Sequence, residues 1–146
     1  MEESINFLAF YKETFELKRA DAETYSPLVL AYIGDAVYEL MIRTKIVNNG
    51  NMQVNKLHKK SSSLVKAETQ ARLIKILQPY LTEEEHAVFK RGRNAKSVTV
   101  AKNASMTDYR MATGFEALIG WLFLAERFER MTELTALGLK EIGELT

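Results

Sequence analysis

The sequence predicts an all-α protein, and three observations support this fold class. Apolar residues recur at intervals of three and four along most of the 146 residues, which is the period of an amphipathic helix. Both prolines, Pro27 and Pro79, stand where helices are expected to begin or end. The only candidate strand, "SVTV" at 97–100, is too short and too isolated to argue for a sheet.

The N-terminal part of the chain is predicted to contain three helices. The first falls within residues 4–18. The second has Ser26 as its N-cap and Pro27 at its first position, and "NNG" ends it after roughly six turns of about 3.6 residues each. A short third helix is expected near residues 52–59.

The rest of the chain predicts four helices and one loop. A capping box, Thr82 followed by Glu85, starts a helix in "LTEEEHAVFKRGRN". Residues 92–104 have no helical period, so we expect an exposed basic loop with a flexible Gly92. The other three helices are expected at 62–78, 105–128 and 130–142.

The composition indicates one globular domain, residues 1–146. Hydrophobic residues make up 47% and charged residues 27% of the chain, an ordinary globular balance. The absence of cysteine excludes disulfides and thiolate metal sites. The N-terminus lacks a signal-peptide layout, and the longest apolar run, "FEALIGWLFLA", is interrupted by Glu116 and is too short to cross a bilayer. We therefore expect a soluble cytoplasmic protein with no membrane partner.

Basic residues are segregated along the chain, although the formal net charge is only +1. No acid lies between Glu39 and Glu68, or between Glu85 and Asp108. Segregation of this kind builds a local positive field without a basic overall composition. The basic residues of these two acid-free segments are Arg43, Lys45, Lys56, Lys59, Lys60, Lys66, Lys90, Arg91, Arg93, Lys96 and Lys102.

Two acids interrupt the two most apolar predicted helices. Asp35 lies in "AYIGDAVYEL" and Glu116 in "GFEALIGWLF", and each has a glycine near it, Gly34 and Gly120. Glycine inside a helix costs about 1 kcal/mol against alanine, and it is tolerated where another backbone must come close. We therefore expect the two helices to cross closely at these points. The predicted buried face around Asp35 consists of Ala31, Ile33, Val37, Leu40 and Met41.

Two carboxylates that face each other across such a crossing repel one another unless a positive group lies between them. Mg²⁺ is one solution, because it needs only one or two carboxylates and keeps its other positions for water and phosphate. The alternative is that each acid is exposed or paired with Arg or Lys. Glu39, one turn after Asp35, lies either near the site or on the surface. Glu83 and His86 have the spacing of a di-iron motif, but the chain lacks the second motif that such a site needs.

The stretches "AYIGDAVYEL" and "FEALIGWLF" resemble the two signature helices of the ribonuclease III family. Three further blocks resemble more specifically its short bacterial branch, the Mini-ribonuclease III proteins. The blocks are "LHKKSSSLVKAETQA" (57–71), "LTEEEHAVFKRGRNAKS" (81–97) and "YRMATGFEALIGWLFL" (109–124). The resemblance spans residues 27–124 and implies a ribonuclease III-like endonuclease domain, a helical bundle, without a separate double-stranded-RNA-binding domain.

The resemblance implies that Asp35 and Glu116 are the catalytic residues and the ligands of a Mg²⁺ cofactor. Standard members of the family have two further acids, at the positions of Ala31 and Thr113 here. This sequence keeps two of the four acids, which leaves the number of metal ions open. No nucleophilic side chain is required, because metal-bound water can supply the hydroxide.

The resemblance also implies the reaction and its partners. It implies an endoribonuclease that cleaves double-stranded RNA to 5′-phosphate and 3′-hydroxyl ends, acts as a homodimer, and matures the ribosomal RNA precursor of the large subunit. The surface near "YIGDAV" is apolar, which makes Tyr32 and Met41 candidates for the dimer contact.

The basic segments are candidates for holding the RNA, because A-form RNA is recognised mainly through its shape, phosphates and 2′-hydroxyls. The alternative is that they form a solvated charged face. A non-catalytic ribonuclease III-like RNA-binding scaffold and a helical protein–protein adaptor remain rivals to an enzyme. The candidate RNA-binding residues are His58, Lys59, Lys60, Arg91, Arg93 and Lys96.

Overall fold

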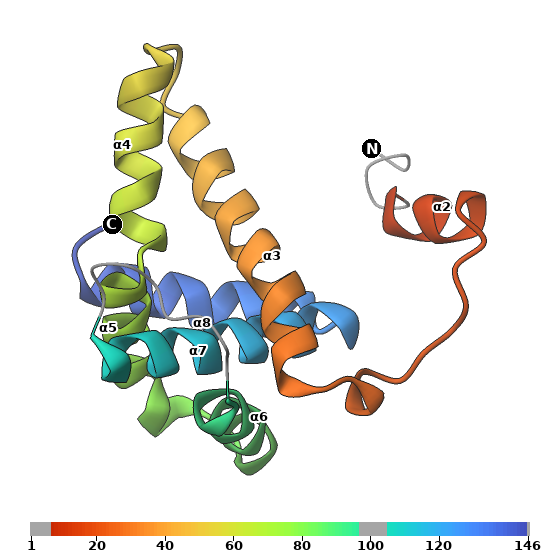
Figure 1. The fold of residues 1–146 in the computed structure, drawn as a ribbon. Helices are drawn as coiled ribbons and strands as arrows, with labels where there is room; N and C mark the ends of the chain where they lie inside the picture. The colour runs from red at the N-terminus through yellow and green to blue at the C-terminus, as the bar shows by residue number, and fades with distance from the viewer. Residues whose placement is uncertain (1–6, 97–104, 146) are drawn as a thin grey trace.

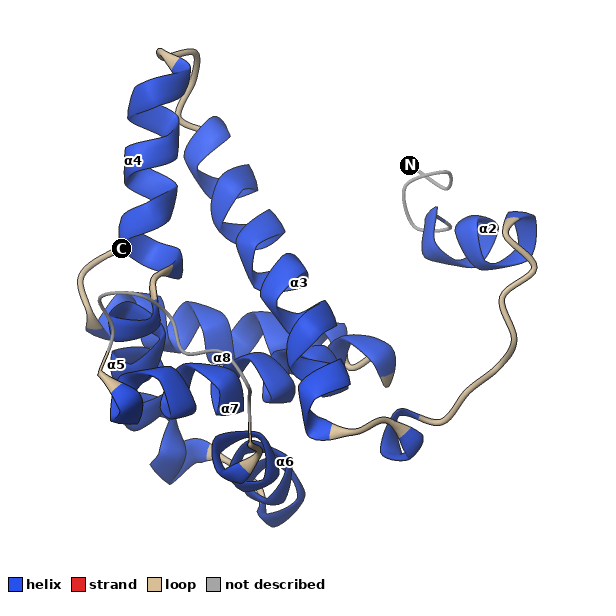
Figure 2. Cartoon of the chain, in the orientation of Figure 1, coloured by secondary structure: helices blue, strands red, loops and turns tan. Residues whose placement is uncertain are grey.

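The fold is taken from a computed structural model of the chain, which describes residues 7–96 and 105–145 (Figure 1). All regular secondary structure in these residues is helical, which confirms the all-α fold class (Figure 2). The stretch "SVTV" lies outside the described residues. The elements are α2 (Phe7–Thr14), η1 (Ala22–Thr24), α3 (Pro27–Val47), α4 (Val54–Val65), α5 (Ala67–Leu77), η2 (Gln78–Tyr80), α6 (Glu83–Asn94), α7 (Met106–Leu124) and α8 (Phe128–Glu141).

Helix α7 runs through the middle of the fold, and α3, α5, α6 and α8 all pack against it. Between Met111 and Leu122, every residue except Glu116 is buried. A helix that is apolar on all sides belongs in a core, so Glu116 is the one interruption of the core helix in this stretch. No helix in the part of the chain that the structure describes is long and apolar enough to span a membrane.

Helices α3 and α4 form a hairpin that rises from the body, whereas α2 lies on the other side of α3 at the end of an extended segment (Figure 1). Helix α2 buries none of its residues. Its Lys12 forms an ion pair with Glu126, at 3.3 Å, just after the end of α7.

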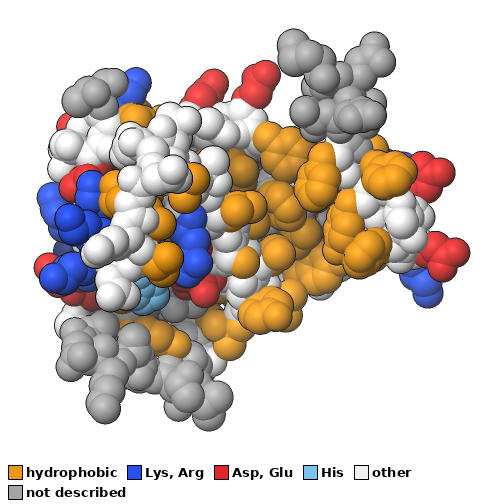
Figure 3. Space-filling model, turned by 90° about the horizontal axis from the view of Figure 1, so that it is seen from above, with side chains coloured by type: hydrophobic (Ala, Val, Ile, Leu, Met, Phe, Trp, Pro, Cys, Tyr) orange, Lys and Arg blue, Asp and Glu red, His pale blue; other side chains and the backbone are white. Residues whose placement is uncertain are grey.

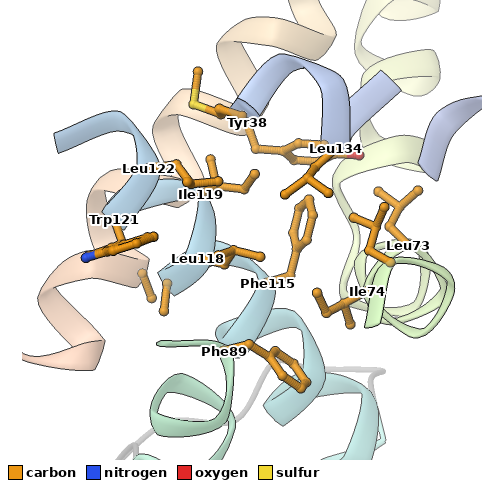
Figure 4. Packing of buried hydrophobic residues seen from close by; sticks show 14 of the residues in the cluster. Tyr38, Leu73, Ile74, Phe89, Phe115, Leu118, Ile119, Trp121, Leu122 and Leu134 are labelled. Carbon is orange, nitrogen blue, oxygen red and sulfur yellow. The ribbon is translucent and has the colours of Figure 1, made fainter. Parts of the chain in front are cut away.

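The core is built around aromatic side chains of α3 and α7 (Figure 4). The rings of Tyr38 and Phe115 meet edge to face, with centroids 5.1 Å apart, a geometry that the ring quadrupoles favour. The Tyr38 hydroxyl donates a hydrogen bond to the Leu64 carbonyl at 2.7 Å, and burial raises the pKa of Tyr38. Phe115 thereby packs against a side chain that ties α3 to the end of α4.

Helices α3 and α7 cross at the two glycines that the sequence singled out. A Cβ atom added to Gly34 would lie 1.8 Å from the carbonyl oxygen of Glu116, and one added to Gly120 would lie 1.9 Å from the carbonyl oxygen of Leu30. The neighbours are backbone atoms and cannot rotate away, so only glycine fits at either position. The predicted close crossing is therefore confirmed.

Two helix starts predicted from capping residues, those of α3 and α6, are also confirmed. Ser26 caps α3, with its hydroxyl accepting a hydrogen bond from the Val29 amide, and Pro27 is the first helical residue. Thr82 and Glu85 form both bonds of the capping box at the start of α6. These starts were predictable because each depends on residues close together in the chain.

The predicted boundary between the helices at 52–59 and 62–78 is wrong, because the break falls at Lys66. Lys66 has extended backbone angles (φ −66°, ψ 154°) between α4 and α5. Two buried side chains of α5 reach back to carbonyls of α4. The Thr69 hydroxyl donates to the Ser63 carbonyl at 2.6 Å, and the Gln70 amide donates to the Val65 carbonyl at 2.8 Å. These bonds satisfy carbonyls at the end of α4.

The predicted loop 92–104 is wrong at its start, because α6 continues to Asn94. Gly92 is buried in this helix and is not a flexible hinge. A Cβ atom there would lie 2.7 Å from the Cβ of Ala117 and 2.9 Å from the Cα of Gly114. The glycine therefore serves the close packing of α6 on α7. Residues 97–104 lie outside the described part of the chain.

We predict that Gly120→Ala destabilises the protein by about 3 kcal/mol, because its Cβ atom would overlap the Leu30 carbonyl. Gly138→Ala is a matched control, since Gly138 is also helical and buried. Its Cβ atom would meet only the Leu73 side chain, at 3.0 Å and beyond, and alanine gains about 1 kcal/mol of helix propensity. Chemical denaturation of both variants measures the difference, and equal stabilities would contradict the crossing.

Candidate functional site

The crossing of α3 and α7 brings Asp35 and Glu116 together. Gly34, directly before Asp35, faces the backbone of Glu116, and the two carboxyl groups are close enough for Asp35 to raise the pKa of Glu116. Among the described residues, neither acid forms an ion pair with Lys or Arg. The structure therefore brings the two acids together, and no basic side chain among the described residues pairs with either of them.

The predicted burial around Asp35 needs correction, because Asp35 is exposed and Glu116 is half-buried. Leu40, predicted to be buried, is 66% exposed. Only one side of α3 is covered, chiefly by α7 and α4, and Asp35 stands beside the covered strip. The residues of that buried strip are Leu30, Ala31, Gly34, Tyr38, Ile42 and Ile46.

The environment of Glu116 makes its ionisation costly. Burial is the main cause that raises the pKa of Glu116 to about 8, and the hydrogen bond and the charge of Asp35 add to it. A hydrogen bond from Gln70 acts in the opposite direction. Without a cation, this carboxyl group therefore holds its proton at neutral pH, as expected for two acids that face each other.

The donor set fits a hard divalent cation. No group of three or more His, Cys, Asp or Glu side chains able to hold a metal occurs in residues 7–96 and 105–145. Asp35 and Glu116 thus offer two carboxylates, and a Mg²⁺ ion commonly takes only one or two from the protein. A cation between them would replace the proton and remove the repulsion.

The other acidic positions do not extend this pair. Ala31 is buried and has no donor atom, and the Thr113 hydroxyl donates to the Tyr109 carbonyl of its own helix at 3.0 Å. Glu39 forms an ion pair with Arg43 one turn further along α3. Glu39 is therefore engaged on the α3 surface, which was one of its two predicted positions.

Gln70 is a residue of this site that sequence reasoning missed. It is 2% exposed, and its side-chain nitrogen lies 3.4 Å from Oε2 of Glu116. Its side-chain oxygen has no hydrogen-bond partner among the described residues. The available signal was its spacing, because position 70 shares the apolar face of Leu73, Ile74 and Leu77 on α5. A polar residue there breaks the helical pattern.

The candidate RNA-binding residues fall into two separate groups. His58, Lys59 and Lys60 are exposed on α4, which packs on α3 and α5. The second group lies at the end of α6, at the opposite end of the body in Figure 1. The members of the second group are Arg91, Arg93 and Lys96.

The second group differs in exposure. Arg91 and Lys96 are exposed, whereas Arg93 is half-buried. The Arg93 guanidinium lies 5.5 Å from the ring centroid of Phe89 and donates a hydrogen bond to Asn94. The Arg93 side chain is therefore held by contacts to residues of its own helix.

Comparison with known proteins shows what this chain is similar to. A family model described as the Ribonuclease III domain matches residues 28–127. A Mini-ribonuclease 3 of Clostridium tetani is 57% identical over 123 residues, which cover 84% of this chain and 82% of that protein. A Mini-ribonuclease 3 of Thermoanaerobacter is 47% identical over 144 residues, 99% of this chain and 100% of that protein. A crystal structure of a Fusobacterium nucleatum protein is similar with a TM-score of 0.75 at 31% identity, covering 80% of this chain and 95% of that chain.

We predict that Glu116 makes the stability of the metal-free protein depend on pH. Its pKa is about 8 in the folded protein, whereas an unfolded glutamate titrates near 4.3. Between these two pH values the folded state binds one more proton than the unfolded state. The free energy of unfolding therefore decreases as the pH rises from about 5 to about 8. Thermal unfolding in EDTA should show this fall for the wild type and a flatter profile for Glu116→Gln.

Glu68→Gln is the control for this measurement, because Glu68 is an exposed carboxylate on α5. It should keep the wild-type pH profile. Parallel profiles for the wild type and Glu116→Gln would mean that the pKa of Glu116 is not raised.

Proposed function

Because this chain belongs to the ribonuclease III family, in its Mini-ribonuclease III group, we propose that it is a Mg²⁺-dependent endoribonuclease that cleaves double-stranded RNA. The observation that carries this proposal is the meeting of Asp35 and Glu116 at a crossing where both helices are fixed by backbone contact. Glu116 is the one acid in the buried stretch of α7 from Met111 to Leu122, and burial makes its ionisation unfavourable.

Asp35 and Glu116 would bind the cation from two different helices. Asp35 approaches from the exposed side of α3, and Glu116 approaches from the core helix α7. Glu116 releases its proton when the cation binds, because both occupy the same carboxylate. A Mg²⁺ ion held by Asp35 and Glu116 would supply an activated water molecule and positive charge for the scissile phosphate. The products are 5′-phosphate and 3′-hydroxyl ends.

Basic side chains of the same domain hold the RNA. The exposed residues of α4 and the end of α6 offer positive charge and hydrogen-bond donors to phosphates and 2′-hydroxyls. Arg93 is less available for contact with the RNA than Arg91 and Lys96, because its guanidinium already packs on Phe89. The resemblance to Mini-ribonuclease III proteins implies a ribosomal RNA precursor of the large subunit as the substrate.

A homodimer is supported by apolar side chains that the protomer leaves in water. Tyr32 is 82% exposed on α3, with Leu28 and Val29 exposed beside it. Figure 3 shows hydrophobic side chains gathered toward the α2 side of this face and Lys and Arg side chains gathered toward the α4 side. Contiguous apolar surface of this kind is typical of an interface. Met41 packs partly against the core of its own protomer, so Tyr32 is the stronger candidate for the contact.

A non-catalytic RNA-binding scaffold is the second candidate function. It is favoured by one observation, the presence of Ala31 and Thr113 where standard family members have acids. A protein–protein adaptor is disfavoured, because it gives no role to the two basic segments.

We predict that the wild type cleaves a labelled RNA duplex in Mg²⁺ and not in EDTA. Asp35→Asn and Glu116→Gln should each lose more than about a hundredfold in rate, because each removes one of two metal-binding carboxylates. Their duplex affinity should stay near that of the wild type. Glu39→Gln is the control and should cleave normally, since Glu39 pairs with Arg43 instead.

Two outcomes would decide against the enzyme. Failure of the wild type to cleave, with duplex binding that weakens in salt, would favour the scaffold. Cleavage by Asp35→Asn at the wild-type rate would remove Asp35 from the metal site.

We predict that Lys59→Ala and Arg91→Ala each weaken duplex binding and make its salt dependence shallower. Each loss of a phosphate contact reduces the slope of log affinity against log salt by about 1. Binding titrations at several salt concentrations measure this slope. Lys140→Ala, an exposed lysine at the end of α8, should leave it unchanged. Wild-type slopes in both test variants would exclude these segments from the RNA site.

A further inference from the structure

Gln70 lies at the point where three parts of the fold meet. It belongs to the first turn of α5, and its amide nitrogen donates to the carbonyl of Val65, the last residue of α4, at 2.8 Å. The same nitrogen lies 3.4 Å from Oε2 of Glu116 on α7. One buried amide group therefore connects the basic helix α4 to the acid pair.

The surroundings fix the orientation of the Gln70 amide. Its nitrogen lies 2.8 Å from the Val65 carbonyl, which can only accept a hydrogen bond. Turning the amide around would place its oxygen against that carbonyl, so the nitrogen must face it. The oxygen Oε1 is consequently directed elsewhere, and it has no partner among the described residues although Gln70 is 2% exposed.

A purely structural role does not account for this arrangement. Thr69, the preceding residue, already joins α5 to α4 through its hydroxyl bond to the Ser63 carbonyl at 2.6 Å, and it leaves no buried polar atom unsatisfied. Gln70 adds a contact to Glu116 and a buried acceptor without a donor. A buried polar atom without a partner calls for an explanation, and the contact to Glu116 is the one that Thr69 does not make.

We propose that Gln70 is a positioning residue of the metal site: its amide nitrogen holds Oε2 of Glu116 in place for the cation. This inference rests on the proposed function and names a side chain that prepares Glu116 for the cation. Partners that orient a metal ligand commonly change metal affinity by 10- to 100-fold. Gln70 acts through Glu116, not on the scissile phosphate itself.

The test compares Gln70→Leu with Thr69→Val. Both substitutions remove a buried bond from α5 to α4, but only the first removes the contact to Glu116. Mn²⁺ binding to the free protein, measured by electron paramagnetic resonance, should weaken about tenfold or more in Gln70→Leu. Thr69→Val should bind Mn²⁺ as the wild type does. The Mg²⁺ concentration for half-maximal cleavage should rise in Gln70→Leu and stay at the wild-type value in Thr69→Val.

Thermal unfolding in EDTA separates this effect from a loss of stability. Gln70→Met, which keeps a long unbranched side chain, replaces Gln70→Leu if the latter does not fold. Equal Mn²⁺ affinity in the wild type and the Gln70 variant would overturn the proposal and leave Gln70 as a link between α4 and α5. Absence of Mn²⁺ binding and of cleavage in the wild type would overturn the proposed function as well.

Discussion

The contact between the backbones of α3 and α7 is the constraint on which the rest of the structure depends. Gly34 and Gly120 let each helix touch the carbonyl groups of the other. This closeness sets the distance from Asp35 to Glu116, and it places Tyr38 against Phe115. A wider crossing would leave the core aromatics without partners and would separate the two acids.

The same contact places Glu116, an acid in the most buried helix, beside Asp35. Ionised Glu116 is unfavourable in that environment, as its raised pKa shows. A cation bound by the two acids, as proposed above, would take the place of the proton on Glu116. Stability of the metal-free protein and affinity for a metal would then be opposed at this one side chain. Such opposition is typical of sites that are shaped for binding.

The sequence predicted the features that depend on neighbouring residues. The start of α3 at Pro27 and the capping box at Thr82 follow from local spacing. The crossing at Gly34 and Gly120 is a long-range contact, and it was predicted because a glycine stands near each of the two acids. The break at Lys66 was missed, because it is stabilised by side chains that fold back from α5. The extension of α6 through Gly92 depends on contact with α7. The exposure of Asp35 depends on which side of α3 the other helices cover.

The glycine contacts are of two kinds, which differ in whether a second substitution could make room for a Cβ atom. At Gly138 the nearest obstacle is the side chain of Leu73, and a smaller residue at position 73 would make room for a new Cβ atom. At Gly34 and Gly120 the obstacle is a carbonyl group that every amino acid carries. No second substitution elsewhere can therefore compensate for a change at either glycine. These two positions are closed to substitution for as long as the helices cross in this way.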